Sequence, residues 1–337
     1  MKNIIKLTLV SIILAMGCSE PIDLKVGLTD PKVVIDGYIS DQFKAQKVIL
    51  SFSSTFFGTG NNIFVPLPIR FASVKVTDDL SNEYVFTHFE KGIYLSQPFK
   101  AEDGRMYKLT VEVEGEIFES SFEALPENSN QIATVDIEFV SRNVTNDKGK
   151  IVEEEGVQAF ATMDKTTNED HFIWAVNHHF AVQTSSVLCY AKDFDLNEVV
   201  IVKDTEANGN EGLPYKVNLS FNVPSYKTNI DFAIDATLLT VNEKAFDYWQ
   251  NIKDQIDRTG GLFDANSNSI KGNVVNISSD NIPLGFFGVY REVENYYFYN
   301  QTDLPIEQNV FSCPGQCLNC ESIPSDYASD VKPSWWR

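Results

Sequence analysis

Apolar and polar residues alternate along residues 33–125, and turn-forming residues interrupt the alternation at short intervals. A period of two is typical of β-strands that bury one face. The predicted strands of this region are Val33–Ser40, Lys47–Ser53, Ser73–Thr77, Glu83–Phe89, Gly92–Gln97, Tyr107–Glu114 and Glu116–Glu123. No helical period interrupts them, so we expect residues 33–125 to form a β-sandwich of immunoglobulin-like or transthyretin-like type.

A second β-rich region covers residues 131–337, after a short polar link. Its predicted strands are Ala133–Ser141, Val157–Met163, His171–Asn177, Val199–Lys203, Tyr215–Val223, Ile230–Leu239, Val274–Ile277 and Leu284–Tyr299. Residues 142–156 and 204–212 are rich in Asn, Asp, Glu and Gly, so we expect exposed loops there. The fold class is therefore all-β, with an N-terminal sandwich and a second sandwich-like domain that carries one α-helix.

The one predicted helix covers residues 243–258. Asn242 is a suitable N-cap, because its side-chain oxygen can accept a hydrogen bond from the first turn. The glycine pair at 260–261 should end the helix. Apolar residues at spacings of three and four form a stripe that we expect to pack on the sheets, and they are Phe246, Trp249, Ile252 and Ile256.

Residues 1–17 have the features of a bacterial signal peptide. Two lysines precede an apolar run at 7–16, which is shorter than the roughly 20 residues that span a bilayer. Residues 14–18 read Leu-Ala-Met-Gly-Cys and resemble a lipobox, although Ala15 stands where Leu, Val or Ile is usual. We expect cleavage before Cys18, lipidation of its sulfur and a lipidated tether at 18–32. The alternative is an ordinary signal peptide with an incidental cysteine.

The chain carries a formal charge of −20, and loss of Lys2 and Lys6 with the signal peptide makes the mature protein two units more negative. Nucleic-acid binding depends on basic side chains that neutralise phosphates, so a nucleic-acid partner is excluded. The charge also opposes binding to a bare anionic membrane, so attachment has to come from the lipid. Solubility is the simplest reason for this charge, and a docking surface for a basic partner is the alternative.

Four cysteines remain after Cys18, and in an oxidising compartment they predict two disulfides. They are Cys189, Cys313, Cys317 and Cys320. One local bridge within the close C-terminal trio would leave its third member for Cys189 and tie down the Cys-rich C-terminal tail. A four-thiolate zinc site and free thiols are the alternatives.

Catalytic motifs are missing from the sequence: it contains no HExxH, no GxSxG and no P-loop. His171 and His179 would lie about 27 Å apart along one strand, too far to share a metal ion. We therefore expect that the protein is not an enzyme and that it has no cofactor and no metal site. We interpret the four histidines as surface or loop residues.

Exposed aromatic residues are the best candidates for contact with a partner. Phe56, Phe57 and Phe64 lie in a loop at 56–69 that also contains two glycines and two prolines. We interpret a later aromatic run and the terminal pair Trp335-Trp336 as residues that pack on the sheets, and a platform for a ligand is the less favoured alternative. The run comprises Tyr290, Tyr296, Tyr297, Phe298 and Tyr299.

Several short motifs, taken in order, resemble a family of Bacteroidetes outer-membrane lipoproteins, the domain-of-unknown-function family 4249. They are Cys18, Val33–Ser40, Gly92-Ile93-Tyr94, Gly104–Tyr107, Tyr248-Trp249, Gly261–Asp264, Gly272-Asn273-Val274, Leu284–Phe287, Cys317–Cys320 and Lys332–Trp336. Ser334-Trp335 departs from the Asp-Phe that is usual near the end of the family. The resemblance implies an outer-membrane location, often beside genes for TonB-dependent receptors, and it implies no catalytic residue.

The leading functional hypothesis is a non-enzymatic outer-membrane lipoprotein, held by its lipid, that binds an unknown ligand or partner. It would act as an accessory module of a TonB-dependent transport system. The residue directly after Cys18 is Ser19 and not aspartate, which favours the outer membrane by the sorting rule of enteric bacteria. The alternatives are a structural or adhesion component of the cell surface and a hydrolase with an unusual site.

Overall fold

β-Strands make up most of the chain in the computed structural model. It describes residues 31–53, 67–127, 133–146, 148–164, 170–203, 213–222, 231–257, 270–300, 304, 319–323 and 327–337. The strands of the first half are β1 (Val33–Ser40), β2 (Lys47–Phe52), β3 (Leu67–Pro68), β4 (Ala72–Asp78), β5 (Glu83–Glu90), β6 (Ile93–Ser96), β7 (Met106–Val113), β8 (Glu116–Ser120) and β9 (Glu123–Ala124). β1 begins and ends at the predicted residues.

The later strands alternate with one α-helix and one 3₁₀ turn. They are β10 (Ala133–Thr145), β11 (Ile151–Asp164), β12 (His171–Gln183), β13 (Leu188–Lys203), β14 (Pro214–Asn222), β15 (Asp231–Val241), α2 (Glu243–Ile256), β16 (Val274–Asn276), β17 (Leu284–Asn300), η3 (Cys320–Ser322) and β18 (Tyr327–Ser329). The predicted all-β class with one helix is confirmed. Among the described residues, no helix is long and apolar enough to span a membrane.

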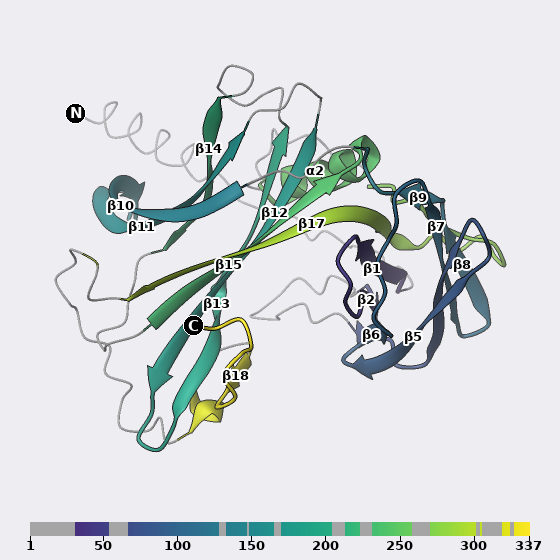
Figure 1. Ribbon diagram of the computed structural model, residues 1–337, viewed down its shortest axis with the longest axis horizontal. Helices are drawn as coiled ribbons and strands as arrows, with labels where there is room; N and C mark the ends of the chain where they lie inside the picture. The colour runs from purple at the N-terminus through teal and green to yellow at the C-terminus, as the bar shows by residue number, and fades with distance from the viewer. Residues whose placement is uncertain are drawn as a thin grey trace, which may run out of the picture.

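The long strand β17 joins two bodies of the molecule (Figure 1). Its first part pairs in parallel with β1, from Val34↔Leu284 to Ser40↔Tyr290. Its second part pairs antiparallel with β15, up to Asp231↔Asn300. We call β1–β9 with β16 and the first part of β17 the N-terminal body, and β10–β15 with α2, β18 and the rest of β17 the C-terminal body.

The core of the N-terminal body is not confined to residues 33–125. Val274, Phe287 and Val289 pack into it beside Ile35, Leu50 and Val76. The side chain of Asn273 holds the returning segment, because it accepts a hydrogen bond from the Phe287 N–H at 2.9 Å and donates one to the Phe287 carbonyl at 2.8 Å. Periodicity placed these residues only within 131–337, since pairing between distant strands leaves no local signal.

The C-terminal body is a sandwich. A three-stranded sheet, β10-β11-β14, packs against one face of the strands β13-β12-β15-β17. Phe172, Trp174 and Val176 alternate along β12 and fill this interface, where Trp174 has no exposed surface. We call this side of β13-β12-β15-β17 the core face and the opposite side the cleft face.

The prediction of an exposed loop at 142–156 is wrong. β10 extends to Thr145 and β11 begins at Ile151, and the two strands stay in register up to the pair Thr145↔Ile151. The polar residues of this segment pair across the hairpin: the Arg142 guanidinium donates a 3.0 Å hydrogen bond to Glu154. Cross-strand ion pairs supply polar strands with the contacts that apolar residues give elsewhere. The second predicted loop, residues 204–212, lies outside the described residues.

Helix α2 packs mainly through its first half. The Asn242 side chain accepts a 2.9 Å hydrogen bond from the Ala245 N–H, as the predicted N-cap requires. Ala245 is buried, and Phe246 and Trp249 pack with it against Leu239. Ile256 is 75% exposed, so the predicted apolar stripe does not continue to the end of the helix. Among the described residues, no strand covers the last turn of the helix, which leaves Ile256 exposed.

One predicted disulfide is present, between Cys189 on β13 and Cys320, with an S–S distance of 2.07 Å. It links β13 to the C-terminal segment, and β18 pairs with the same strand. Both sulfurs are oxidised, so neither can be a thiolate ligand of zinc. Cys313 and Cys317 lie outside the described residues.

Candidate binding cleft

A cleft of about 170 Å³ lies between the N-terminal body and the cleft face of the C-terminal body. Its walls come from strands β1 and β2 on one side, β12, β13, β15 and β17 on the other, and helix α2. The residues that line it are Asp36, Gly37, Tyr38, Lys47, Ile49, Ile173, Ala175, Val199, Leu239, Trp249 and Tyr290. Sites between domains with an apolar lining and few polar groups are the usual places for small ligands.

Strand geometry places the charged residues of the cleft. Asp36 and Tyr38 point to one side of β1, whereas Ile35 and Ile39 point into the N-terminal core. Asp36 pairs with Ile49 and Tyr38 pairs with Lys47. Asp36 and Lys47 are therefore diagonal neighbours on the same face, a relation that separates residues by about 7–8 Å.

Aromatic rings form the wall of the cleft beside α2. Tyr38 stacks on Tyr290 with ring centroids 5.3 Å apart, and Tyr248 stacks on Phe286 at 5.0 Å. The indole N–H of Trp249 donates a hydrogen bond to the Tyr290 hydroxyl. Burial strongly raises the pKa of Tyr290, so its phenol stays protonated and can hold this contact. These contacts fix Trp249 and Tyr290 before a ligand arrives.

Asp36 has an unusual environment for a carboxylate. The residue is exposed at the cleft surface, yet protein surrounds it on most sides. This burial raises the pKa of Asp36, and the positive charge of Lys47 lowers it in part. Within the part of the chain that the structure describes, neither side chain forms a hydrogen bond or an ion pair. The cleft therefore contains one carboxylate and one ammonium that are both available to a ligand.

A polar strip continues the cleft face beyond this lining. Lys44 forms an ion pair with the buried Glu292 and lies 3.4 Å from Glu294. Burial raises the pKa of Asp235 to about 6, with a further contribution from Glu294. The charges of Glu292, Glu294, Asp36 and Asp235 add to the effect of burial in raising the pKa of Tyr38. This strip makes the end of the cleft near β17 acidic.

The interpretation of the histidines as surface or loop residues is wrong for those on β12. His171 and His178 are buried, and burial lowers the pKa of His178 and of His179 to about 4. His179 packs against Trp335, with ring centroids 4.9 Å apart. The strand runs on to Gln183, beyond its predicted end at 177, which places His178 and His179 inside the sheet. No group of three metal-ligating side chains occurs among the described residues.

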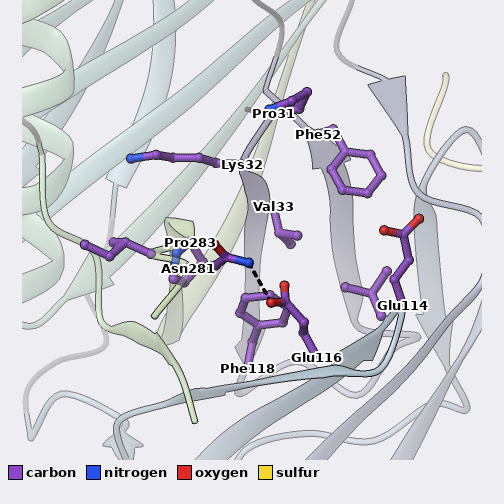
Figure 2. Close-up of a pocket in the computed structure, with 11 residues that line it drawn as sticks. Pro31, Lys32, Val33, Phe52, Glu114, Glu116, Phe118, Asn281 and Pro283 are labelled. Carbon is purple, nitrogen blue, oxygen red and sulfur yellow. Dashed lines mark hydrogen bonds between the residues drawn. The ribbon is translucent and has the colours of Figure 1, made fainter. Parts of the chain in front are cut away.

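Figure 2 shows a second cavity, of about 480 Å³, at the end of the N-terminal body where β1 begins. Phe52 and Phe118 form its apolar side, and Glu116 lies at its rim. Glu116 already accepts hydrogen bonds from Asn281 and Ser279, each at 2.6 Å, which lower its pKa. Two more charged residues, Lys32 and Glu114, line this cavity beside Phe52 and Phe118, whereas the smaller cleft has an aromatic wall held by its own contacts, and that preformed wall favours the smaller cleft as the ligand site.

Several predicted site residues lie outside the described residues, namely Cys18, Phe56, Phe57, Phe64, Cys313 and Cys317. Sequence reasoning missed the cleft itself. Tyr290 was predicted to pack on the sheets, and it is only 3% exposed. It also lines the cleft. The one available signal was Asp36, a charge in the middle of an apolar strand. Nothing local links it to Lys47 and Trp249.

Three of the motifs that resemble a known family meet around this cleft. Val33–Ser40 forms β1, Tyr248-Trp249 lies on α2, and Leu284–Phe287 opens β17 beside both. A comparison with curated proteins found none that matches the chain. A family model does match, over residues 19–296, most of the chain. The chain therefore belongs to the family described as Domain of unknown function (DUF4249).

Proposed function

We propose that this protein is a non-enzymatic lipoprotein of the outer membrane that binds a small ligand in the cleft. It would act as an accessory to a TonB-dependent receptor. The observation that carries the proposal is the cleft itself: a fixed aromatic wall faces a carboxylate and an ammonium that have no hydrogen-bond or ion-pair partner among the described residues. Each of these charges can form a charge-assisted hydrogen bond with a ligand that enters the cleft.

The location rests on the N-terminal sequence. The lipobox-like segment before Cys18 supports lipidation, and acyl chains on one residue provide a stable anchor. The resemblance to Bacteroidetes lipoproteins supports the outer membrane and the receptor partner. The strongly negative charge supports attachment through lipid and opposes direct adsorption to anionic headgroups.

Ligand binding is tested with the mature lipidated protein in mild detergent. Amino acids, short peptides and monosaccharides are screened by thermal shift, and hits are titrated by calorimetry. We expect at least one class to bind, with Trp249→Ala weakening it at least tenfold. Ile256→Ala is the matched control, because Ile256 lies on the same helix but is 75% exposed and does not line the cleft. No binding from any class, or equal losses in both variants, would remove the cleft from the proposal.

Anchoring and partnership need separate experiments. Mass spectrometry of the native protein should find an acylated Cys18 as the first residue, and Cys18→Ser should move the protein to the soluble fraction. Purification in mild detergent should recover a β-barrel receptor with the wild type. A native protein that keeps residues 1–17, or an isolated protein without a barrel partner, would contradict these parts of the proposal.

A role in adhesion is the second candidate, and it rests on a different surface. Phe71 is 90% exposed and Phe89 is 65% exposed, on β4 and β5 or beside them. Large exposed aromatic residues mark contact surfaces. A Phe71→Ser/Phe89→Ser variant should reduce adhesion of cells and leave ligand binding unchanged if this candidate holds. Loss of uptake with normal adhesion would favour the transport role.

A further inference from the structure

The two charged residues that line the cleft have a fixed relation to each other, and neither has a partner in the part of the chain that the structure describes. Asp36 on β1 and Lys47 on β2 are diagonal neighbours on the same face, a relation that puts their Cα atoms about 7–8 Å apart. Opposite charges on adjacent strands usually pair with each other when they can. Here they influence each other electrostatically without an ion pair, so a ligand can lie between them.

The size of the space limits the ligand. A volume of about 170 Å³ is below the range of about 300–1,000 Å³ that is usual for drug-sized molecules. It corresponds to roughly six water molecules. The remaining lining, from Leu239, Ala175 and Ile173, is aliphatic and offers no further charge. The ligand is therefore small, with both charges at one end and an apolar part at the other.

We propose that the cleft binds a free α-amino acid with an apolar side chain. Its ammonium group donates to the Asp36 carboxylate, and its carboxylate accepts from the Lys47 ammonium. Its side chain packs against Trp249, Tyr290 and Leu239. This inference rests on the proposed function, because it names the ligand class of the same cleft.

The pair of opposite charges suits a dipolar molecule. An α-amino acid carries an ammonium and a carboxylate on the same carbon, so both are presented at one end of the molecule. Each can form a charge-assisted hydrogen bond of about 2.8 Å with one of the two side chains, which extend from neighbouring strands into the same cleft. A simple cation would leave Lys47 without a partner, and a simple anion would leave Asp36 without one. A neutral monosaccharide would provide no opposite charge for either Asp36 or Lys47.

The test uses calorimetry on the mature lipidated protein with L-leucine and L-phenylalanine as probes. Each probe is compared with its N-acetyl derivative, which lacks the ammonium, and with its amide, which lacks the carboxylate. We expect each derivative to bind at least tenfold more weakly than the parent amino acid. Glucose and galactose serve as neutral probes and should not bind.

Two variants assign the charges to their partners. Asp36→Asn should weaken binding of the amino acid at least tenfold. It should also abolish the preference of the cleft for the amino acid over its N-acetyl derivative. Lys47→Gln should instead abolish the preference of the cleft for the amino acid over its amide. Asp280→Asn and Lys100→Gln change exposed residues away from the cleft and should behave as wild type. A crossed pattern of preferences cannot come from misfolding, because misfolding weakens all probes together.

The outcomes separate this inference from the proposed function. Binding of a monosaccharide that Trp249→Ala abolishes would overturn the amino-acid assignment and keep the cleft as a ligand site. Equal affinity for the amino acids and both derivatives would also overturn it. If no probe of any class binds, the inference and the cleft proposal fail together.

Discussion

His178 and His179 are adjacent in the sequence but lie on opposite faces of β12. On the core face, the Nε2 atom of His178 lies 2.7 Å from the Ser220 hydroxyl, in an otherwise apolar interface with β14. On the cleft face, the Nε2 atom of His179 lies 3.9 Å from an Asp235 oxygen. Burial lowers the pKa of each histidine to about 4, although His178 is buried and His179 only partly buried, so the main difference between the two faces lies in the polar partners.

The difference separates stability from binding. On the core face, His178 has the Ser220 hydroxyl as its partner and large apolar side chains surround it, and the one unpartnered polar atom of Trp174 is a neutral indole N–H. On the cleft face, Asp235 Oδ1 and His179 Nε2 are buried without a hydrogen-bond partner among the described residues. Asp36 and Lys47, across the cleft, also have no hydrogen-bond or ion-pair partner within the described ranges. We therefore expect substitutions on the core face to lower stability and substitutions in the cleft to alter ligand binding.

Removing the disulfide at the edge of the core face should have the largest effect. Cys189 and Cys320 are 131 residues apart, and closing so long a loop stabilises a protein by about 4–5 kcal/mol on the chain-entropy model. Chemical denaturation of Cys189→Ala/Cys320→Ala should show a loss of that order. Binding at the cleft should persist in the fraction that stays folded. A loss below about 1 kcal/mol would show that the bridge does not stabilise this core.

Trp174→Ala should be the next largest change, because Trp174 has no exposed surface on the core face. Truncation of a buried aromatic residue costs about 3–5 kcal/mol. Val199→Ala is the matched substitution in the cleft, where Val199 is 43% exposed, and it should cost below about 1 kcal/mol. Urea denaturation of both variants measures the contrast. Equal losses would contradict the separation of the two faces.

The dependence of stability on pH should distinguish the two histidines. His178 has a folded pKa of about 4, below its usual 6.5, so its stabilising effect is complete above pH 6.5 and is lost as the pH falls towards 4. A shift of this size corresponds to about 3 kcal/mol. His178→Gln should therefore flatten the profile of unfolding free energy between pH 6.5 and 4. The exposed His88→Gln is the control.

On the cleft face, the effects of two groups oppose each other. His179 loses its contribution as the pH falls from 6.5 towards 4, as His178 does. Asp235 has a raised folded pKa of about 6, so its contribution is present at low pH and is lost as the pH rises through 6. His179→Gln/Asp235→Asn should change the profile less than His178→Gln alone. A larger change would mean that the cleft face also determines acid stability.

Asp36→Asn should have the smallest effect on stability. Burial raises the pKa of Asp36, so ionisation at neutral pH opposes folding, and a neutral side chain of similar shape removes that opposition. The denaturation midpoint should stay unchanged or rise slightly. Asp280→Asn provides the exposed control. A clear fall in the midpoint would show that Asp36 has a structural partner instead of a ligand.

Sequence periodicity predicted the strands well where apolar residues alternate, as in β1, and it predicted the Asn242 cap from a local hydrogen bond. It failed at 142–156, because polar residues that pair across a hairpin look like a loop in one dimension. The cleft was beyond reach for a different reason. The proximity of Asp36, Lys47 and Trp249 depends on strand register and on the pairing of β1 with β17.

The continuity of β17 restricts how the protein can respond to a ligand. The strand is hydrogen-bonded to β1 in its first part and to β15 in its second, without a break in the chain between the two. Rotation of one body against the other would have to bend or unpair this strand, so hinge closure is strongly opposed. The protein should therefore bind as a rigid receptor, with an unchanged scattering profile on saturation and little entropy lost to ordering the backbone.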